Sequence, residues 1–161
     1  MSKSRWRIVS GFAVVCTYAA VLQAAPKPPE YADDLGPDTI DVSAYSADMQ
    51  AGYKKFEAKC AVCHSAARAV NSDLVTSKEW ERYIKRMWQR PPCCNLCPVI
   101  SKADAKAIWK FLTYDSQIRK TGPNAEAWQK HHHALLAEFK ARYPKKYQEH
   151  YGVIERKKEP L

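Results

Sequence analysis

Glycine is scarce in this chain, with five residues in 161, and no internal repeat is visible. Together with ten prolines, this composition excludes a collagen-like or low-complexity protein. Sustained alternation of apolar and polar residues is also lacking, so the sequence predicts an all-α fold with essentially no sheet. Because 46% of the residues are apolar and 27% are charged, the chain is neither wholly disordered nor wholly membranous. Its length suits one domain with extensions.

Acidic residues are missing from the first 25 positions, where Lys3, Arg5 and Arg7 precede an apolar run that extends to Ala25. A basic head followed by an apolar stretch is typical of a secretory signal peptide. Because a larger residue stands where the cleavage site usually has a small one, an uncleaved N-terminal anchor is the alternative. In both cases we expect the folded part in an oxidising compartment, most simply a bacterial periplasm, tethered to the membrane if the segment is retained.

The next segments combine an extended stretch with a first helix. Residues 26–46 are rich in Pro, Asp and Ser and are predicted to form an extended lead-in. A helix is expected from near Ala47, with Asp48 as its cap, and the spacing of Gly52, Phe56 and Cys60 places these three residues on one face. Residues 65–75 lack clear periodicity and are predicted to form a loop.

Three further helical patterns follow. Thr76 or Ser77 with Glu79 indicates a helix start, and the apolar stripe of this helix ends before Pro91. Residues 101–120 give the clearest helical pattern. An amphipathic stretch over 125–143 adds a helix before a polar, basic tail that we expect to fray. The chain thus divides into residues 1–25, the lead-in, a domain over 47–120, and a C-terminal extension over 121–161.

The most informative motif is Cys60-Ala61-Val62-Cys63-His64, the C-x-x-C-H pattern of covalent haem attachment. Two thiols three positions apart can form thioethers with the two vinyl groups of a porphyrin, and the adjacent histidine can bind the iron. A disulfide or half of a zinc site is the alternative for a lone C-x-x-C. The export signal, the preceding helix, the histidine and the lack of a matching second motif favour one covalent haem c.

Two stretches around this motif carry a family resemblance. Gly52-x-x-x-Phe56-x-x-x-Cys60-x-x-Cys63-His64 resembles the N-terminal helix and haem motif of small monohaem class I cytochromes c, and Ile108-x-x-Phe111-Leu112 resembles their C-terminal helix. The resemblance covers residues 47–120. It implies an all-α cytochrome c domain around one haem, in which these two helices cross with the glycine at their contact.

The sixth ligand of the iron decides the class of function. Iron held on both axial sides exchanges electrons, whereas iron with an open side binds small molecules. The resemblance implies Met87 as the second axial ligand beside His64. Met87 also falls on the apolar stripe of its helix, so packing in the core is the alternative. An electron carrier is the first hypothesis, and a haem enzyme or redox or gas sensor with an open or thiol-ligated iron is the second.

The sequence departs from this family after Met87, where Cys93, Cys94 and Cys97 follow two prolines. Three uses compete: a local disulfide that joins Cys97 to Cys93 or Cys94, a zinc or copper site completed by the histidines at 131–133, and thiolate ligation of the haem iron. Three consecutive helical histidines point about 100° apart and cannot all bind one metal. A polar helix face is therefore predicted for the histidines.

Charge is unevenly distributed along the chain. Residues 26–59 carry a net charge of −3, residues 60–120 carry +6 and residues 121–161 carry +3. A positive domain suits fast, weak encounters with an acidic redox partner, and a merely soluble basic surface is the alternative. Nucleic acid is not expected as a partner in this compartment. We therefore expect a periplasmic electron carrier, free or as the haem subunit of a respiratory redox complex, whose C-terminal helix wraps back over the domain or docks on a larger assembly.

Overall fold

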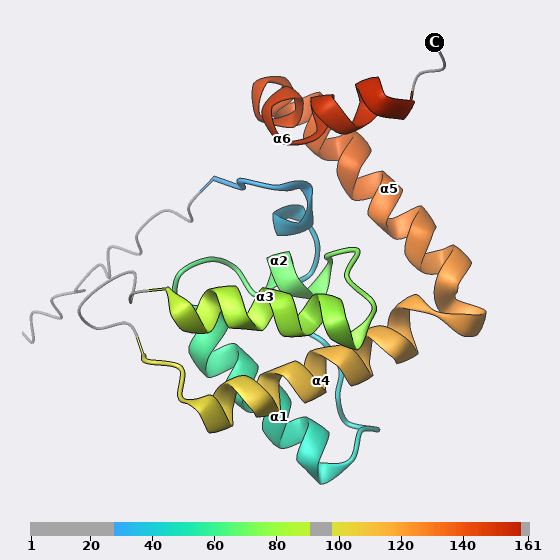
Figure 1. The fold of residues 1–161 in the computed structure, drawn as a ribbon. Helices are drawn as coiled ribbons and strands as arrows, with labels where there is room; N and C mark the ends of the chain where they lie inside the picture. Colours follow the sequence, from blue (N-terminus) through green and yellow to red (C-terminus); the bar gives the residue numbers. More distant parts are fainter. Residues whose placement is uncertain (1–27, 91–97, 159–161) are drawn as a thin grey trace, which may run out of the picture.

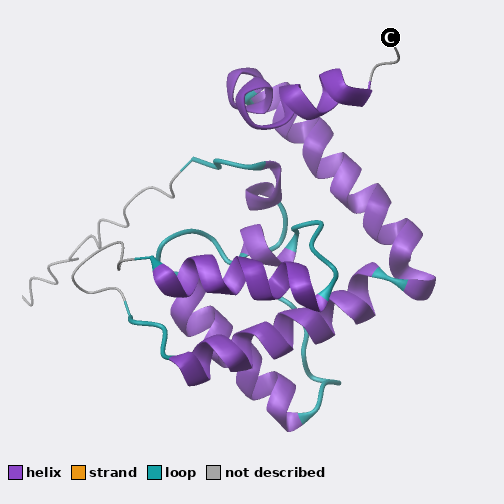
Figure 2. Cartoon of the chain, in the orientation of Figure 1, coloured by secondary structure: helices purple, strands orange, loops and turns teal. Residues whose placement is uncertain are grey.

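Helices dominate the part of the chain that this computed structural model describes, residues 28–90 and 98–158, and no strand occurs in those two ranges. In chain order the elements are η1 Ala32–Leu35, α1 Ala47–Cys60, α2 Ala67–Val70, α3 Ser77–Gln89, α4 Lys102–Lys120, η2 Gly122–Asn124, α5 Ala125–Arg142 and α6 Pro144–Lys158 (Figures 1 and 2). The predicted all-α fold class is confirmed.

The main core lies among α1, α3 and α4, which pack closely in Figure 1. Phe56 of α1, Trp80 of α3 and Phe111 of α4 are fully buried there. At the crossing of α1 with α4, a Cβ atom on Gly52 would lie 2.9 Å from Phe111 Cβ and 3.2 Å from the carbonyl oxygen of Ala107. A side chain at this position would push the two helices apart, so Gly52 permits their close approach. The contact expected between these two helices is present.

Side-chain caps define where two of the core helices begin. Thr76 Oγ1 accepts a hydrogen bond from the Glu79 amide at 3.3 Å, and Glu79 Oε2 accepts one from the Thr76 amide at 2.7 Å. This is the predicted capping box at the start of α3. Ser101 caps α4 by accepting from the Asp104 amide at 3.0 Å. The prediction that Asp48 caps this helix is wrong, because Asp48 lies inside the first turn of α1. There its negative charge interacts favourably with the positive end of the helix dipole.

The lead-in is more structured than its composition predicts. Asp34 Oδ2 accepts from the amides of Glu30 and Tyr31 at 2.9 and 3.1 Å, which closes the turn that contains η1. The same carboxylate binds the Arg68 guanidinium through two hydrogen bonds of 2.9 and 2.7 Å. Arg68 belongs to α2, a short helix within the stretch predicted to be a loop. Long-range acid–base pairing therefore orders two segments that show no periodicity of their own.

The C-terminal extension folds back onto this lead-in. We call α5 and α6 the C-terminal arm; in Figure 1, α5 leads away from the end of α4, and α6 crosses its far end. Phe139 and Tyr147 of the arm bury Ala32 of η1 in a second, smaller core. Lys146 Nζ lies 2.7 Å from Glu30 Oε2. The arm thus wraps back over the chain, and the tail that was expected to fray is helical as far as Lys158.

Candidate functional site

The C-x-x-C-H motif starts at the last residue of α1 and continues into the turn before α2. Cys60 is half-buried against the main core, and its thiol is free. Burial raises the pKa of this thiol to about 12. Cys63 is exposed and disulfide-bonded. The two motif cysteines are therefore not bonded to each other, and the disulfide of Cys63 has to open before its sulfur can bond to a vinyl group.

The tautomer of His64 follows from the residue next to it. His64 Nδ1 lies 2.9 Å from the backbone oxygen of Ser65. A carbonyl oxygen only accepts hydrogen bonds, so Nδ1 carries the proton. In the neutral ring this leaves the lone pair of Nε2 available for a metal.

Helix α3 brings Tyr83 near the motif and carries Met87 one turn further along. Burial raises the pKa of Tyr83 to about 12; Cys60 adds to this shift, whereas Arg68 and Arg86 oppose it. The Tyr83 hydroxyl is buried and forms no hydrogen bond with the residues that the structure describes. Met87 is half-buried and lies four residues after Tyr83, so both side chains share one helix face. Met87, the predicted sulfur ligand, therefore lies on the same face of α3 as Tyr83, whose pKa is affected by Cys60.

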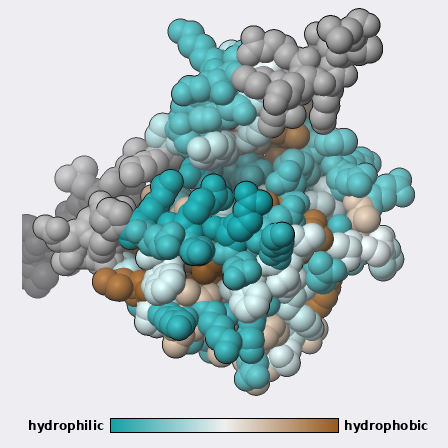
Figure 3. Space-filling view, in the orientation of Figure 1, coloured by the Kyte–Doolittle hydropathy of each residue, from teal (hydrophilic) through white to brown (hydrophobic). Residues whose placement is uncertain are grey.

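Exposed apolar side chains gather at this end of the molecule. Val62, Trp88 and Val99 are 49%, 44% and 72% exposed. Lys59 Nζ donates a hydrogen bond of 3.1 Å to the Val99 carbonyl, which holds Val99 beside the end of α1. Figure 3 shows hydrophobic surface next to the residues drawn in grey. Exposed apolar side chains beside the motif could contact an apolar ligand or partner.

We define the motif end as the C-x-x-C-H motif together with Tyr83, Met87 and the exposed residues Val62, Trp88 and Val99. The chemistry of these residues fits a haem. His64 offers a nitrogen ligand, Cys60 offers a free thiol, and the apolar side chains suit the face or edge of a macrocycle. The Tyr83 hydroxyl, which forms no hydrogen bond with the described residues, offers a donor to a polar group. The Cys63 disulfide is the feature that has to change before both thioethers can form.

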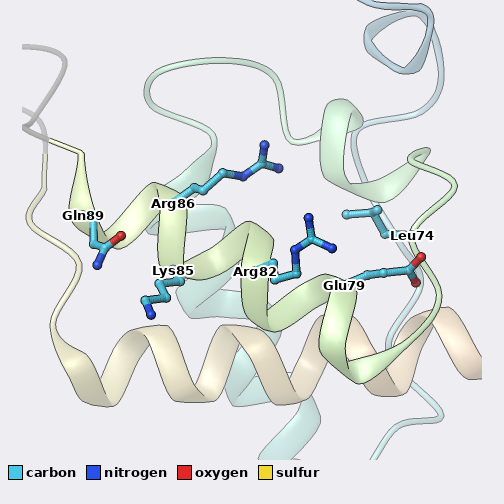
Figure 4. Close-up of a pocket in the computed structure, with 6 residues that line it drawn as sticks. All are labelled: Leu74, Glu79, Arg82, Lys85, Arg86 and Gln89. Atoms are coloured by element: carbon cyan, nitrogen blue, oxygen red, sulfur yellow. The ribbon is translucent and has the colours of Figure 1, made fainter.

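A hollow of about 440 Å³ lies along the outer face of α3 (Figure 4). It is lined by Leu74, Glu79, Arg82, Lys85, Arg86 and Gln89. Within the described residues, Arg82, Lys85 and Arg86 form no ion pair, whereas Glu79 is occupied by the capping box. Hydrogen bonds from Thr76 lower the pKa of Glu79. The hollow is therefore basic and suits an anionic group.

A second polar cluster, which sequence reasoning missed, lies where α4 meets α5. Asp115 is 1% exposed and accepts a hydrogen bond from the Tyr45 hydroxyl at 3.0 Å. It also binds the Arg119 guanidinium at 2.7 and 2.5 Å. Arg119 in turn donates to the Val70 carbonyl at 3.0 Å and lies over the Trp128 ring of α5. The i, i+4 spacing of Asp115 and Arg119 could have indicated their pairing, but not its burial.

Lys120 completes this cluster, which we call the α4–α5 junction. Its ammonium group donates to the carbonyl oxygens of Ser72 and Leu74 at 2.8 and 3.2 Å. The rings of Trp80 and Trp128 lie 5.2 and 4.8 Å from the nitrogen. Burial lowers the pKa of Lys120 to about 7, even though the carbonyls and indole faces favour the charged form. Local sequence carries no signal for this burial, because a lysine near the end of a helix is normally exposed.

Two residues of the histidine run connect the arm to other parts of the fold, His132 to the lead-in and His131 to the residue after α2. His131 Nε2 lies 3.2 Å from Asn71 Oδ1, His132 Nε2 lies 3.4 Å from Asp33 Oδ1, and His133 is exposed. No group of three or more His, Cys, Asp or Glu side chains among the described residues could hold a metal ion. The predicted cysteine uses involve Cys93, Cys94 and Cys97, which lie outside the described residues, as does the predicted export segment 1–25.

No family model, curated protein or solved structure matches this chain. None of the helices in the described ranges is long and apolar enough to cross a bilayer.

Proposed function

We propose that this protein is an exported c-type cytochrome that transfers electrons through one covalently bound haem c. Cys60 and Cys63 would hold the haem through thioethers, and His64 Nε2 and the Met87 sulfur would be the ligands of its iron. The observation that carries this proposal is the C-x-x-C-H motif at the end of α1, with the His64 tautomer that leaves Nε2 free. When bound, the haem supplies reversible one-electron chemistry at its iron.

Attachment requires both motif sulfurs as thiols. Cys60 is already free, and its raised pKa keeps it protonated and slow to oxidise at neutral pH. Cys63 becomes available when a dithiol reductant supplies two electrons and two protons to its disulfide. The protein should therefore accept haem in its reduced state and not in its oxidised state.

The basic hollow on α3 supports an acidic redox protein as the partner. Arg82, Lys85 and Arg86 form no ion pair within the described residues, and they lie on the helix that carries Met87. A positive surface close to the site of electron exit accelerates encounters with a negatively charged docking surface. We propose a periplasmic role, as a free shuttle or as the haem subunit of a respiratory redox complex, with no nucleic-acid partner.

The deciding experiment is the optical spectrum of the ferric, haem-loaded protein beside that of Met87→Ala. Met49→Ala is the matched control, because Met49 is also half-buried but lies in the first turn of α1. We expect the wild type and the control to show the weak long-wavelength band of methionine-to-iron charge transfer. Met87→Ala should lose this band, and its ferrous form should bind carbon monoxide readily.

Two results would contradict the proposal in different ways. A wild-type protein that lacks the band and binds carbon monoxide readily is a haem enzyme or a redox or gas sensor with an open or thiol-ligated iron, which is the second candidate. A wild-type protein without a haem stain after denaturing electrophoresis carries no covalent haem at all. If haem is attached through the motif, Cys60→Ala/Cys63→Ala should remove that stain.

A further inference from the structure

The backbone oxygen of Ser65, which accepts the Nδ1 proton of His64 at 2.9 Å, also accepts from a second donor. The Arg68 amide lies 3.3 Å from the same oxygen. In addition, the Ser65 hydroxyl accepts a hydrogen bond from the Ala67 amide at 3.1 Å. The carbonyl that orients the His64 ring is therefore fixed by backbone groups of α2. A hydrogen bond to Nδ1 sets the tautomer of a histidine and the direction in which Nε2 faces a metal.

The position of α2 depends on the side chain of Arg68. This helix has only four residues, which is too few for a stable helix without tertiary contacts. The Arg68 guanidinium reaches the lead-in and binds the two carboxylate oxygens of Asp34 at 2.9 and 2.7 Å. The Asp34 side chain is 7% exposed, so water and salt screen this pair little. A contact through two parallel hydrogen bonds fixes the orientation of the guanidinium as well as its position.

The arm supports this part of the lead-in. The Ala32 amide donates a hydrogen bond of 3.1 Å to the Tyr151 hydroxyl of α6. The Tyr31 ring contacts the Arg68 guanidinium, whose carbon lies 4.6 Å from the ring centre, and the His150 ring of α6, whose centroid lies 4.5 Å away. Direct contacts therefore connect α6 to the lead-in and the lead-in to α2.

These contacts lead to the residue that the proposed function makes an iron ligand. We propose that Asp34 and Arg68 are positioning residues for His64, which they orient through the Ser65 carbonyl, and that the arm supports them. Ser65 is exposed, so packing does not fix its carbonyl and hydrogen bonds have to do so. This inference rests on the proposed function, because it assigns the lead-in a role in orienting a ligand of the haem iron.

Amide hydrogen exchange in the haem-free protein tests the first half of this connection. Arg68→Lys keeps the charge but loses the two-point contact with the carboxylate, and Asp34→Asn removes the counter-ion. Each variant should lower the protection factor of the amide at position 68 roughly tenfold. The Leu112 amide in the core helix α4 is the internal reference and should keep its protection.

The second half is tested in the ferrous, haem-loaded protein by NMR exchange of the His64 Nδ1 proton with solvent. Asp34→Asn and Arg68→Lys should each speed this exchange roughly tenfold. The double variant should be no faster than either single variant, because both substitutions break the same contact. Tyr151→Phe, which removes the hydrogen bond from the arm, should have a smaller effect.

The matched control is Arg142→Lys. Arg142 pairs with Glu138 on the exposed surface of α5, so the same change of side chain is made in an ion pair without a path to His64. This variant should leave both the protection at position 68 and the exchange of the His64 proton at their wild-type values.

Each outcome supports or overturns the inference. It is overturned if Asp34→Asn and Arg68→Lys lower protection equally at position 68 and at Leu112, since the pair then only stabilises the whole fold. It is also overturned if the His64 proton exchanges at the wild-type rate in both variants. If the wild type carries no covalent haem, the proposed function fails together with this inference, and the haem stain separates that case from the other two.

Discussion

The α4–α5 junction and the motif end differ in how well their polar and apolar groups are paired. At the junction, the carboxylate of Asp115, the guanidinium of Arg119 and the ammonium of Lys120 each contact several partners. At the motif end, Cys60 has a free thiol and the Tyr83 hydroxyl has no partner among the described residues. Apolar side chains are also exposed there, including Val99 at 72%.

This difference shows which region the chain completes with its own residues. Buried charges are tolerated at the junction because hydrogen bonds and indole rings replace water. The motif end combines a buried hydroxyl that has no partner within the described ranges, a free thiol and exposed apolar side chains, and a large amphipathic ligand would satisfy this combination. The junction is therefore expected to govern stability, and the motif end to govern ligand binding and electron exchange.

The largest effect is expected at the junction from Asp115→Asn. This change leaves Arg119 without its buried counter-ion and should reduce the free energy of unfolding by about 3 kcal/mol. Urea denaturation of the haem-free protein measures it. Glu138→Gln is the control, because Glu138 pairs with Arg142 at the same i, i+4 spacing but in solvent. The control should show no measurable loss; an equal loss in both variants would mean that burial does not distinguish the two pairs.

The second-largest effect is expected in the pH dependence of the free energy of unfolding, to which Lys120 contributes. The pKa of Lys120 is lowered from 10.5 to about 7 in the folded protein, so between these values the unfolded chain binds more protons. The contribution of Lys120 to the free energy of unfolding therefore rises with pH, by about 1 kcal/mol per pH unit at most. Lys120→Met should flatten the stability profile between pH 7 and pH 8.5.

A control variant and the other charged groups near Lys120 are needed to interpret the pH dependence of stability. Lys110→Met, at an exposed position of α4, should leave the rise intact. His132 acts in the opposite sense, because its contact with Asp33 raises its pKa and the stability that it contributes is lost as pH rises through that value. Asp33, Asp73, Asp115 and Arg119 also act on Lys120. An unchanged slope in Lys120→Met would show that this lysine remains charged throughout the range.

The smallest effect is expected at the hollow beside the motif end. Lys85→Glu should slow oxidation of the ferrous, haem-loaded protein by hexacyanoferrate(III), an anionic probe, by roughly threefold, and the effect should shrink at high salt. Lys106→Glu makes the same change of charge at an exposed position of α4 and should slow it less. Equal slowing in both variants would indicate that net charge, rather than the hollow, attracts the probe.

Several features could be predicted from the sequence because they depend on neighbours along the chain. Thr76 with Glu79 predicted the start of α3, and the spacing of Gly52, Phe56 and Cys60 predicted one face of α1. The motif itself is contiguous. The Tyr83 hydroxyl was not singled out, because nothing local shows that it lacks a hydrogen-bond partner among the described residues.

Other features were missed because their partners are distant in sequence. The lead-in becomes ordered through Asp34 and Arg68, which are 34 positions apart, and through a hydrogen bond from the Ala32 amide to the Tyr151 hydroxyl, 119 positions away. The helical tail was missed for the same reason, since Tyr147 is buried against residues at the other end of the chain.

Residue order alone was enough to predict the all-α class and the helix start at Thr76, because periodicity and capping act over a few residues. It also places Cys60, Cys63 and His64 in one contiguous motif. The tertiary structure alone decided that Lys120 is buried between two tryptophans, that Cys60 is free while Cys63 is disulfide-bonded, and that the arm covers the lead-in. Burial and pairing depend on which surfaces meet when the helices pack, and local sequence does not encode that information.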